Sequence, residues 1–198
     1  MPSASTCPPI ILASSSPYRR EALERLGLDF RCLSPSIDEE AMKDPSLQPQ
    51  ALASHLARAK ALSLLPQFPQ AIIIGSDQLV DLDGEILGKP NDAKGAQQQL
   101  QRMSGRSHRL ITAMEVISPE GCFHHCDITT LHMHALTDAG IQRYIERDQP
   151  WNCAGSYRIE AAGISLFVAI TSKDHSAITG LPILALVSIL RKLGHPIP

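Results

Sequence analysis

The chain begins with the pattern of a strand, a turn and a helix. The apolar run Ile10–Ala13 predicts a short buried strand. The polar run Ser14–Ser16 follows it, and Pro17 comes next. Serine is a preferred helix N-cap, and proline suits the first helical position. Apolar residues then recur at helical spacing as far as Leu26, and Gly27 can close the helix. We therefore expect a serine-rich turn at a helix N-terminus.

The rest of the chain alternates between helical and extended patterns. Cap residues and helical spacing predict helices from Ser46 with Pro49 to about Leu65, from Asn91 or Asp92 to near Gly105, from Thr137 to about Arg147, and from Pro182 to Gly194. Apolar or alternating runs predict strands over Ala71–Gly75, Ser107–Ile117, Gly121–His134 and Gly163–Thr171, and Asp83-Gly84 predicts a hairpin turn within 79–87. Long adjacent strands mixed with helices predict one domain over residues 1–198. Its class is α/β (mixed α+β), with a bent mixed sheet.

Composition removes several classes of protein. The 198 residues are 43% hydrophobic, which allows a sizeable core, and the formal net charge is −2. Without a basic excess, we expect no attraction of nucleic acid. No run approaches the roughly 20 apolar residues of a membrane span, and residues 1–9 lack a signal-peptide pattern. The five cysteines suggest no disulfide framework, which favours a reducing cytoplasm.

The serine-rich turn is the first candidate site. Ser14, Ser16, Arg19 and Arg20 would gather hydroxyl groups, two guanidinium groups and the free N–H groups of a helix N-terminus. Planar guanidinium groups suit phosphate oxygens, so this combination favours a phosphate-binding cradle. An ordinary capped helix with solvated arginines explains the same residues.

Carboxylates form the second candidate site. Asp77 follows an apolar run, so we expect it where a buried strand ends, a place at which α/β proteins often bind ligands. A carboxylate there can bind Mg²⁺ or accept a proton from water. Glu39, within the acidic run 38–40, also suits a hard divalent cation. A turn-capping role for Asp77 and a solvated acidic turn around Glu39 are the alternatives.

Two lysines are further candidate site residues. Lys60 has alanine neighbours on its predicted helix, so its side chain has room to reach inward, and Lys89 follows the predicted hairpin. Each is equally consistent with an ordinary surface charge. No P-loop motif or nucleophile elbow is present in the sequence.

One predicted strand is rich in potential zinc ligands. A single face of the strand over 121–134 would carry Cys122, His124, Cys126, His132 and His134. Their spacing matches no standard zinc pattern, and the strand spreads them too far apart to chelate one ion. We therefore expect no zinc there.

Taken in order, these segments resemble one known family. Residues 10–20, Ile-Ile-Leu-Ala-Ser-Ser-Ser-Pro-Tyr-Arg-Arg, closely resemble the opening motif of the Maf family of nucleotide pyrophosphatases. The resemblance continues through Ile37-Asp38-Glu39, Ala59-Lys60-Ala61, Gly75-Ser76-Asp77-Gln78, residues 83–90, Ser104-Gly105, Ala154-Gly155-Ser156-Tyr157 and Gly180-Leu181-Pro182. It therefore spans nearly the whole chain.

This resemblance implies both a fold and a chemistry. The implied fold is a long curved mixed sheet flanked by helices, with two lobes around a nucleotide cleft. The implied reaction is cleavage of a nucleoside triphosphate between the α and β phosphates, with Mg²⁺ or Mn²⁺ as cofactor. Asp77 matches the family's proton acceptor, and Glu39 matches its acidic, metal-associated position. The matching phosphate-binding positions are Arg19, Arg20, Lys60 and Lys89. By the same resemblance, a homodimer is expected.

Three further positions bear on the base. Most family members that act on dTTP or UTP have Arg, Thr and Gln where this chain has Tyr18, Gln78 and Glu160. The present residues resemble the subgroup that hydrolyses 7-methyl-GTP, although that subgroup often has Trp at the first position. Methylation makes guanine cationic, so an aromatic face attracts it and a carboxylate complements its charge. Packing of Tyr18 on its own helix and an ion pair of Glu160 with Arg158 are the alternatives.

We therefore expect a cytoplasmic enzyme that converts 7-methyl-GTP to 7-methyl-GMP and pyrophosphate. A dTTP or UTP pyrophosphatase of the same family is the nearest rival, and residues 18, 78 and 160 speak against it. A non-catalytic nucleotide-binding regulator, for instance of cell division, is the rival from another class. Such a binder needs no proton acceptor, whereas Asp77, Glu39, Lys60 and Lys89 are all present.

Overall fold

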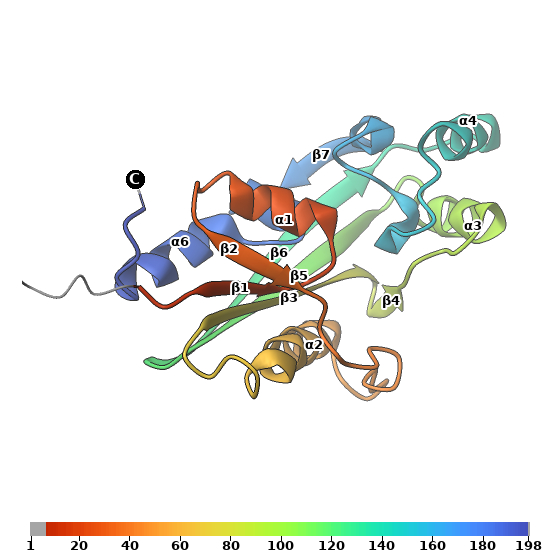
Figure 1. The fold of residues 1–198 in the computed structure, drawn as a ribbon. Helices are drawn as coiled ribbons and strands as arrows, with labels where there is room; N and C mark the ends of the chain where they lie inside the picture. Colours follow the sequence, from red (N-terminus) through yellow and green to blue (C-terminus); the bar gives the residue numbers. More distant parts are fainter. Residues whose placement is uncertain (1–6, 198) are drawn as a thin grey trace, which may run out of the picture.

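The structure, a computed structural model, describes residues 7–197 and is built on a mixed sheet of seven strands (Figure 1). The strand order is β2-β1-β3-β5-β6-β7, and β4 also pairs with β3. β1 runs parallel to β2 and β3, whereas the other pairs are antiparallel. The strands are β1 Ile10–Ala13, β2 Phe30–Leu33, β3 Ile72–Leu82, β4 Glu85–Leu87, β5 Ser107–Ser118, β6 Gly121–Met133 and β7 Phe167–Thr171.

Helices cover both faces of the sheet. They are α1 Pro17–Glu24, α2 Pro49–Leu64, α3 Ala93–Met103, α4 Asp138–Asp148, α5 His175–Ile178 and α6 Ile183–Lys192, with two 3₁₀ helices, η1 Ala154–Ser156 and η2 Ala162–Leu166. The predicted caps Ser16, Asp92 and Thr137 are confirmed, since each side chain accepts a hydrogen bond from a backbone N–H of its helix. The hairpin turn at Asp83-Gly84 is also confirmed.

Two packed regions occupy the two ends of the long strands. Ile74 of β3 packs in a core with α1 and α6, which we call the first region. Val80 packs in a core with α3, α4, η1 and η2, the second region (Figure 1). Ser76 and Gln78 lie between Ile74 and Val80 on the same face, because side chains alternate along a strand. α2 packs against the other face.

Two predicted strand boundaries are wrong. The strand expected to end before Asp77 continues to Leu82, because residues 76–78 stay paired with residues 112–114 of β5. Asp77 therefore lies in the middle of β3. The strand expected from Gly163 begins at Phe167, because the Gly163 N–H bonds back to the Arg158 carbonyl (3.0 Å) and residues 162–166 form η2. β2 and α5 were not predicted.

The second region buries an uncharged histidine. His108 of β5 is 2% exposed, and its Nε2 lies 3.1 Å from the Tyr157 hydroxyl. Burial lowers the pKa of His108 from 6.5 to about 4. The unfolded chain therefore takes up this proton at a higher pH than the folded chain does. The stabilising contribution is complete above about pH 6.5 and is lost as the pH falls towards about 4.

We expect this histidine to make stability depend on pH. Protonation of His108 alone should lower the free energy of unfolding by about 3 kcal/mol between neutral pH and about pH 4. His108→Gln should remove this part of the pH dependence. Urea unfolding of both proteins across that range measures the difference, and equal slopes would contradict the assignment.

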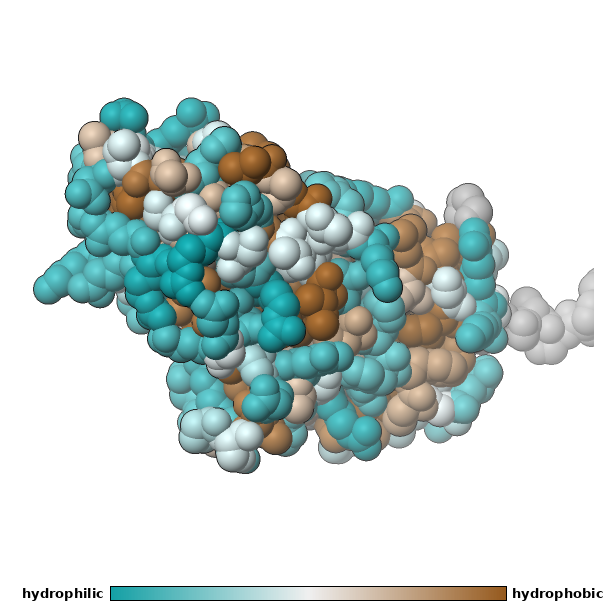
Figure 2. All heavy atoms as spheres, turned by 180° about the vertical axis from the view of Figure 1, so that it is seen from behind, coloured by the Kyte–Doolittle hydropathy of each residue, from teal (hydrophilic) through white to brown (hydrophobic). Residues whose placement is uncertain are grey.

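Among residues 7–197, no helix is long and apolar enough to cross a membrane. The face seen in Figure 2 is largely hydrophilic, and its apolar residues gather in separate patches. Scattered exposed apolar residues of this kind are normal on a folded protein and indicate no membrane contact by themselves.

Candidate active site

The two packed regions flank a stretch of β3, residues 76–79, that no strand within residues 7–197 pairs with on one edge. We call this unpaired stretch the gap. β1 ends opposite Gly75, and β4 ends opposite Val80. In the described part of the chain no strand therefore pairs with residues 76–79 on that side, although β5 pairs with them on the other. Neighbouring strand residues point to opposite faces. A ligand at this gap can therefore reach Asp77 on one face and Gln78 on the other.

Asp77 belongs to a buried cluster of charges. Lys60 of α2 places its Nζ 2.6 Å from Asp77 Oδ1 and 3.1 Å from Glu39 Oε1. Asp77 is 5% exposed and Lys60 4%, whereas Glu39 lies on an exposed loop. The second oxygen of Asp77, Oδ2, is buried without a hydrogen-bond partner. The structure thus brings together three of the predicted residues and leaves one carboxylate oxygen without a partner.

Lys60 reaches Asp77 because α2 lies very close to β3. A Cβ atom on Gly75 would stand 2.2 Å from the Ala57 carbonyl oxygen and 2.7 Å from the Ala61 backbone nitrogen. Gly75 and Asp77 share one face of β3, so the helix that passes over the glycine also sets Lys60 over the carboxylate. The small residues around Lys60 permit this contact.

We expect Gly75→Ala to push α2 away from β3 and separate Lys60 from Asp77. The added methyl group meets backbone atoms, which cannot rotate aside, so the free energy of unfolding should fall by about 1–3 kcal/mol. Hydrolytic activity should fall as well. Gly88→Ala is the matched control for urea unfolding, because a Cβ there meets nothing within 4 Å. Wild-type stability and activity in Gly75→Ala would contradict the close approach.

The serine-rich turn forms as predicted and holds one arginine. Ser16 caps α1, and its Oγ accepts from the Arg19 backbone nitrogen (3.5 Å). Ser14 Oγ accepts from the Ser16 backbone nitrogen (3.1 Å) and from Arg19 Nη1 (3.4 Å). Arg19 Nε donates to the Gly180 carbonyl oxygen (2.8 Å). Two nitrogens of the guanidinium group are therefore fixed by the protein.

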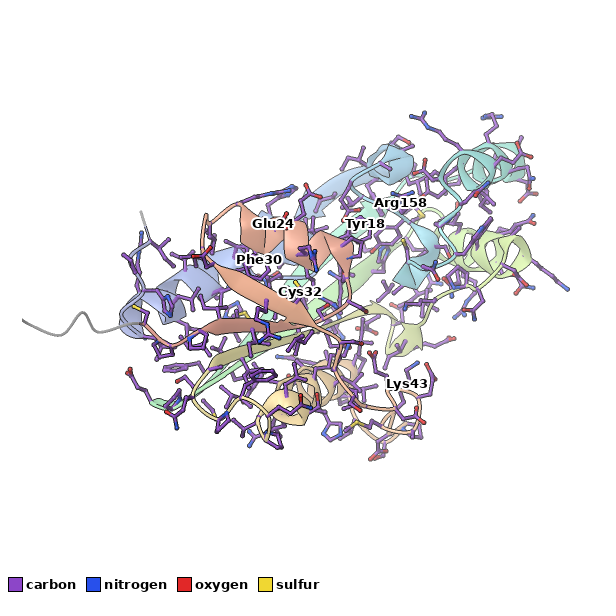
Figure 3. The ribbon with its side chains drawn as sticks, viewed as in Figure 1. Tyr18, Glu24, Phe30, Cys32, Lys43 and Arg158 are labelled. Carbon is purple, nitrogen blue, oxygen red and sulfur yellow. The ribbon has the colours of Figure 1, made fainter. Side chains whose placement is uncertain are left out.

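Only one of the two predicted arginines lies near the acidic cluster. Burial lowers the pKa of Arg19, and the nearby carboxylates of Asp77 and Glu39 oppose this shift. Arg20 is exposed and instead lines a hollow of about 210 Å³. Leu28 and Asp29 line it too, together with Glu24, Phe30 and Cys32, which are labelled in Figure 3. The phosphate-binding role of Arg20 stays a prediction.

The three predicted base-selecting residues come from separate elements around the gap. Gln78 Nε2 donates to Thr112 Oγ1 and to two carbonyl oxygens of α5, at 3.0 Å each, which leaves Oε1 for a ligand. Tyr18, in the first turn of α1, lies towards Arg158 of the second region (Figure 3). Glu160 is exposed in the turn before η2. No hydrogen bond joins the three side chains within residues 7–197, so their common role stays a prediction.

Lys89 lies on the second-region side of the gap. It is exposed in the segment after β4. Burial raises the pKa of the Cys153 thiol, and the charges of Arg158, Glu160 and Lys89 also act on it. These three charged side chains therefore lie within electrostatic reach of one thiol. Phosphate binding by Lys89 stays a prediction.

The sequence did not predict that the segment 174–184 holds Arg19 and Ser76 in place. The Gly180 carbonyl oxygen accepts from both Arg19 Nε and Ser76 Oγ, at 2.8 Å each. The backbone φ of Gly180 is +99°, which favours glycine. Buried Asp174 fixes the segment through the Leu184 backbone nitrogen (2.9 Å). The motif at 180–182 was the available signal, but a backbone acceptor leaves no side-chain signature in a sequence.

The acidic residues fit a divalent cation that shares its ligands with a substrate. Mg²⁺ is usually held by one or two carboxylates together with phosphate oxygens. Asp77 supplies an unpartnered buried oxygen, and Glu39 supplies a partly exposed carboxylate. Among residues 7–197, no three His, Cys, Asp or Glu side chains are placed to hold an ion alone. Substrate oxygens would have to complete the coordination.

The cysteine- and histidine-rich face of β6 lies apart from this cluster. Cys122, His124, His132 and His134 are exposed, as strand alternation predicts. His124 Nδ1 lies 3.2 Å from Glu115 Oε2, beside a hollow of about 520 Å³ next to α2. The expectation that the protein binds no zinc there stays a prediction.

Comparison with known proteins shows the family. The sequence profile described as Maf-like protein matches residues 9–193, so the chain belongs to this family. It is 47% identical over 191 residues to the 7-methyl-GTP pyrophosphatase of Xanthomonas axonopodis pv. citri (strain 306), covering 96% of this chain and 100% of that protein. It is 48% identical over 181 residues to the protein of the same name from Bdellovibrio bacteriovorus (strain ATCC 15356 / DSM 50701 / NCIMB 9529 / HD100), covering 91% and 95%.

A solved structure resembles this fold. The HAM1 protein from Coxiella burnetii superposes with a TM-score of 0.51 over 93% of this chain and 99% of that chain, at 13% identity. At this identity the likeness concerns the fold alone. The predicted class, a mixed sheet flanked by helices, is confirmed.

Proposed function

We propose that this Maf-like protein hydrolyses 7-methyl-GTP to 7-methyl-GMP and pyrophosphate. The observation that carries the proposal is the state of Asp77 at the open edge of β3. One of its oxygens is held by Lys60, and the other is buried without a partner. The name of the relatives at 47% and 48% identity supports the methylated guanine as the base.

The reaction needs a proton acceptor and groups that stabilise phosphate charge. The Asp77 carboxylate, whose Oδ1 is held by Lys60, accepts a proton from the attacking water. Arg19 uses Nε and Nη1 to hold its place, so Nη2 can face a phosphate oxygen and stabilise the developing charge. The N-terminus of α1 adds backbone N–H donors. A divalent cation held by Glu39 and Asp77 would neutralise phosphate charge and activate water.

Base selection in this proposal rests on Tyr18, Gln78 and Glu160. The ring of Tyr18 offers a face for the cationic base. The Glu160 carboxylate accepts from guanine N1–H and the 2-amino group, and it complements the charge of the methylated ring. Uracil and thymine present a carbonyl where guanine presents these donors, so they gain less from Glu160.

We expect Glu160→Gln to lower the specificity constant for 7-methyl-GTP about tenfold to a hundredfold. The amide keeps the size of the side chain but loses the charge, and its NH₂ group opposes a donor. Losing a charge-assisted hydrogen bond costs roughly 1.5–3 kcal/mol. UTP should lose less or gain. Glu120→Gln, an exposed carboxylate in the turn between β5 and β6, is the control. An unchanged ratio of 7-methyl-GTP to UTP would remove Glu160 from base recognition.

Product analysis tests the proposed bond cleavage. The protein, 7-methyl-GTP and Mg²⁺ are incubated, and the nucleotide and phosphate products are separated and quantified. The proposal predicts equal amounts of 7-methyl-GMP and pyrophosphate. Formation of 7-methyl-GDP and phosphate would place the cut at another bond, and no hydrolysis of any nucleotide would favour the non-catalytic regulator.

The proposed reaction belongs in the cytoplasm, where it would remove modified nucleotides before RNA polymerases use them. All five cysteines are free, which supports a reducing compartment.

A further inference from the structure

Tyr18 and Arg158 meet across the gap between the two packed regions. Tyr18 belongs to the first turn of α1, and Arg158 lies between η1 and η2 (Figure 3). The Arg158 guanidinium lies within hydrogen-bonding reach of the Tyr18 hydroxyl. Electrostatic attraction to the same phenol raises the pKa of Arg158. No ion pair joins Arg158 to Glu160 within residues 7–197, so the alternative expected from the sequence does not form.

The backbone of Arg158 is anchored firmly in the second region. Its N–H donates to the Tyr144 hydroxyl (2.9 Å), and its carbonyl accepts from the Gly163 N–H (3.0 Å). A Cβ atom on Gly163 would stand 2.3 Å from that carbonyl oxygen, so glycine is required for this close approach. The guanidinium also donates through Nη1 to the Asp148 carbonyl (3.4 Å). The charged end of Arg158 therefore has a preset position from which to hold Tyr18.

Among residues 7–197, the Tyr18 hydroxyl makes no hydrogen bond with any residue other than Arg158. Tyr18 is half-buried in the first helical turn, and Arg158 is the side chain that holds its polar tip. An aromatic ring stacks well only when its plane is fixed, and a ring fixed in advance loses less conformational freedom on binding. A guanidinium group placed directly on a methylated guanine would repel the cationic base. Arg158 is therefore better placed to orient the Tyr18 ring than to contact the base itself.

We propose that Arg158 is a positioning residue that fixes the Tyr18 ring for stacking on the base. The contact of its guanidinium with the phenol hydroxyl sets the ring across the gap before the nucleotide arrives. The inference rests on the proposed function for the identity of the base. It adds a residue that the predicted base-selecting set of Tyr18, Gln78 and Glu160 does not contain.

A double-mutant cycle tests this proposal. Tyr18→Phe keeps the ring and removes the hydroxyl, whereas Arg158→Met keeps the length of the chain and removes the donor. Each should raise KM for 7-methyl-GTP about tenfold and change kcat by less than about twofold. The double variant should be no worse than either single variant, because both remove one interaction. Arg158→Lys, which retains a charged donor, should recover part of the lost affinity.

Arg147→Met is the matched control, since Arg147 also lies beside Asp148 but is a separate arginine of α4. It should leave KM unchanged.

Additive losses in the double variant, or a wild-type KM in Tyr18→Phe, would overturn the proposal. The wild-type preference among nucleotides tests the proposed function separately. The cycle is therefore measured on the nucleotide that wild type prefers, and coupling there supports the positioning role whichever base that is.

Discussion

Asp77→Asn should lower kcat by about 10²–10⁴ while the protein stays folded. The amide occupies the same space in β3, but it cannot accept the proton of the attacking water. Lys60 keeps Glu39 as a partner at 3.1 Å, so its buried charge is not left without a carboxylate. Steady-state kinetics with 7-methyl-GTP give the change in kcat, and urea unfolding shows that the fold is retained.

Asp81→Asn is the matched control for this variant. Asp81 is also a buried carboxylate of β3 on the same face, but it is held by Arg109 (2.7 Å) and the Gly84 N–H (2.7 Å) at the hairpin. Its loss should affect stability rather than catalysis. Activity of Asp77→Asn within a few-fold of wild type would reject Asp77 as the proton acceptor.

Removal of divalent metal should lower turnover by at least about a thousandfold. A triphosphate beside Asp77 and Glu39 concentrates negative charge, and Lys60 and Arg19 neutralise only part of it. Activity is measured in excess chelator and again after Mg²⁺ or Mn²⁺ is returned in excess. The melting temperature should stay unchanged in chelator, because the cluster is already paired through Lys60.

Variants of the acidic loop sharpen the metal prediction. Glu39→Gln should raise the Mg²⁺ concentration needed for half-maximal activity. Asp38→Asn should not, because Asp38 Oδ1 accepts from the Ala41 N–H (3.1 Å) and serves the turn. Full turnover in excess chelator, or equal metal dependence in both variants, would contradict a cation held by Glu39 and Asp77.

Features that depend on neighbours in the chain were predicted well. Ser16 caps α1 because its side chain reaches a backbone N–H three residues away. The Asp83-Gly84 hairpin forms because both residues adopt the positive φ angles that such a turn needs, +53° and +92°. The order of candidate residues along the chain also predicted the family, and the profile match over residues 9–193 confirms it.

Features that depend on distant contacts were harder to predict. The polar run at 76–78 was interpreted as a strand end, because polar residues after an apolar run usually mark a turn. It lies within β3 because β5 remains paired there while β1 has already ended. The contact of Lys60 with Asp77 requires α2 to cross β3 at Gly75, and sequence spacing does not contain that crossing. The Gly180 carbonyl acts through the backbone alone.

The most direct test of the proposed function is the wild-type preference among nucleotides. Specificity constants for 7-methyl-GTP, GTP, UTP and dTTP are measured by pyrophosphate release at one saturating Mg²⁺ concentration. The proposal predicts that 7-methyl-GTP exceeds UTP and dTTP by about tenfold or more, as one well-matched polar contact to the base allows. A wild-type protein that prefers UTP or dTTP would contradict the methylguanine assignment.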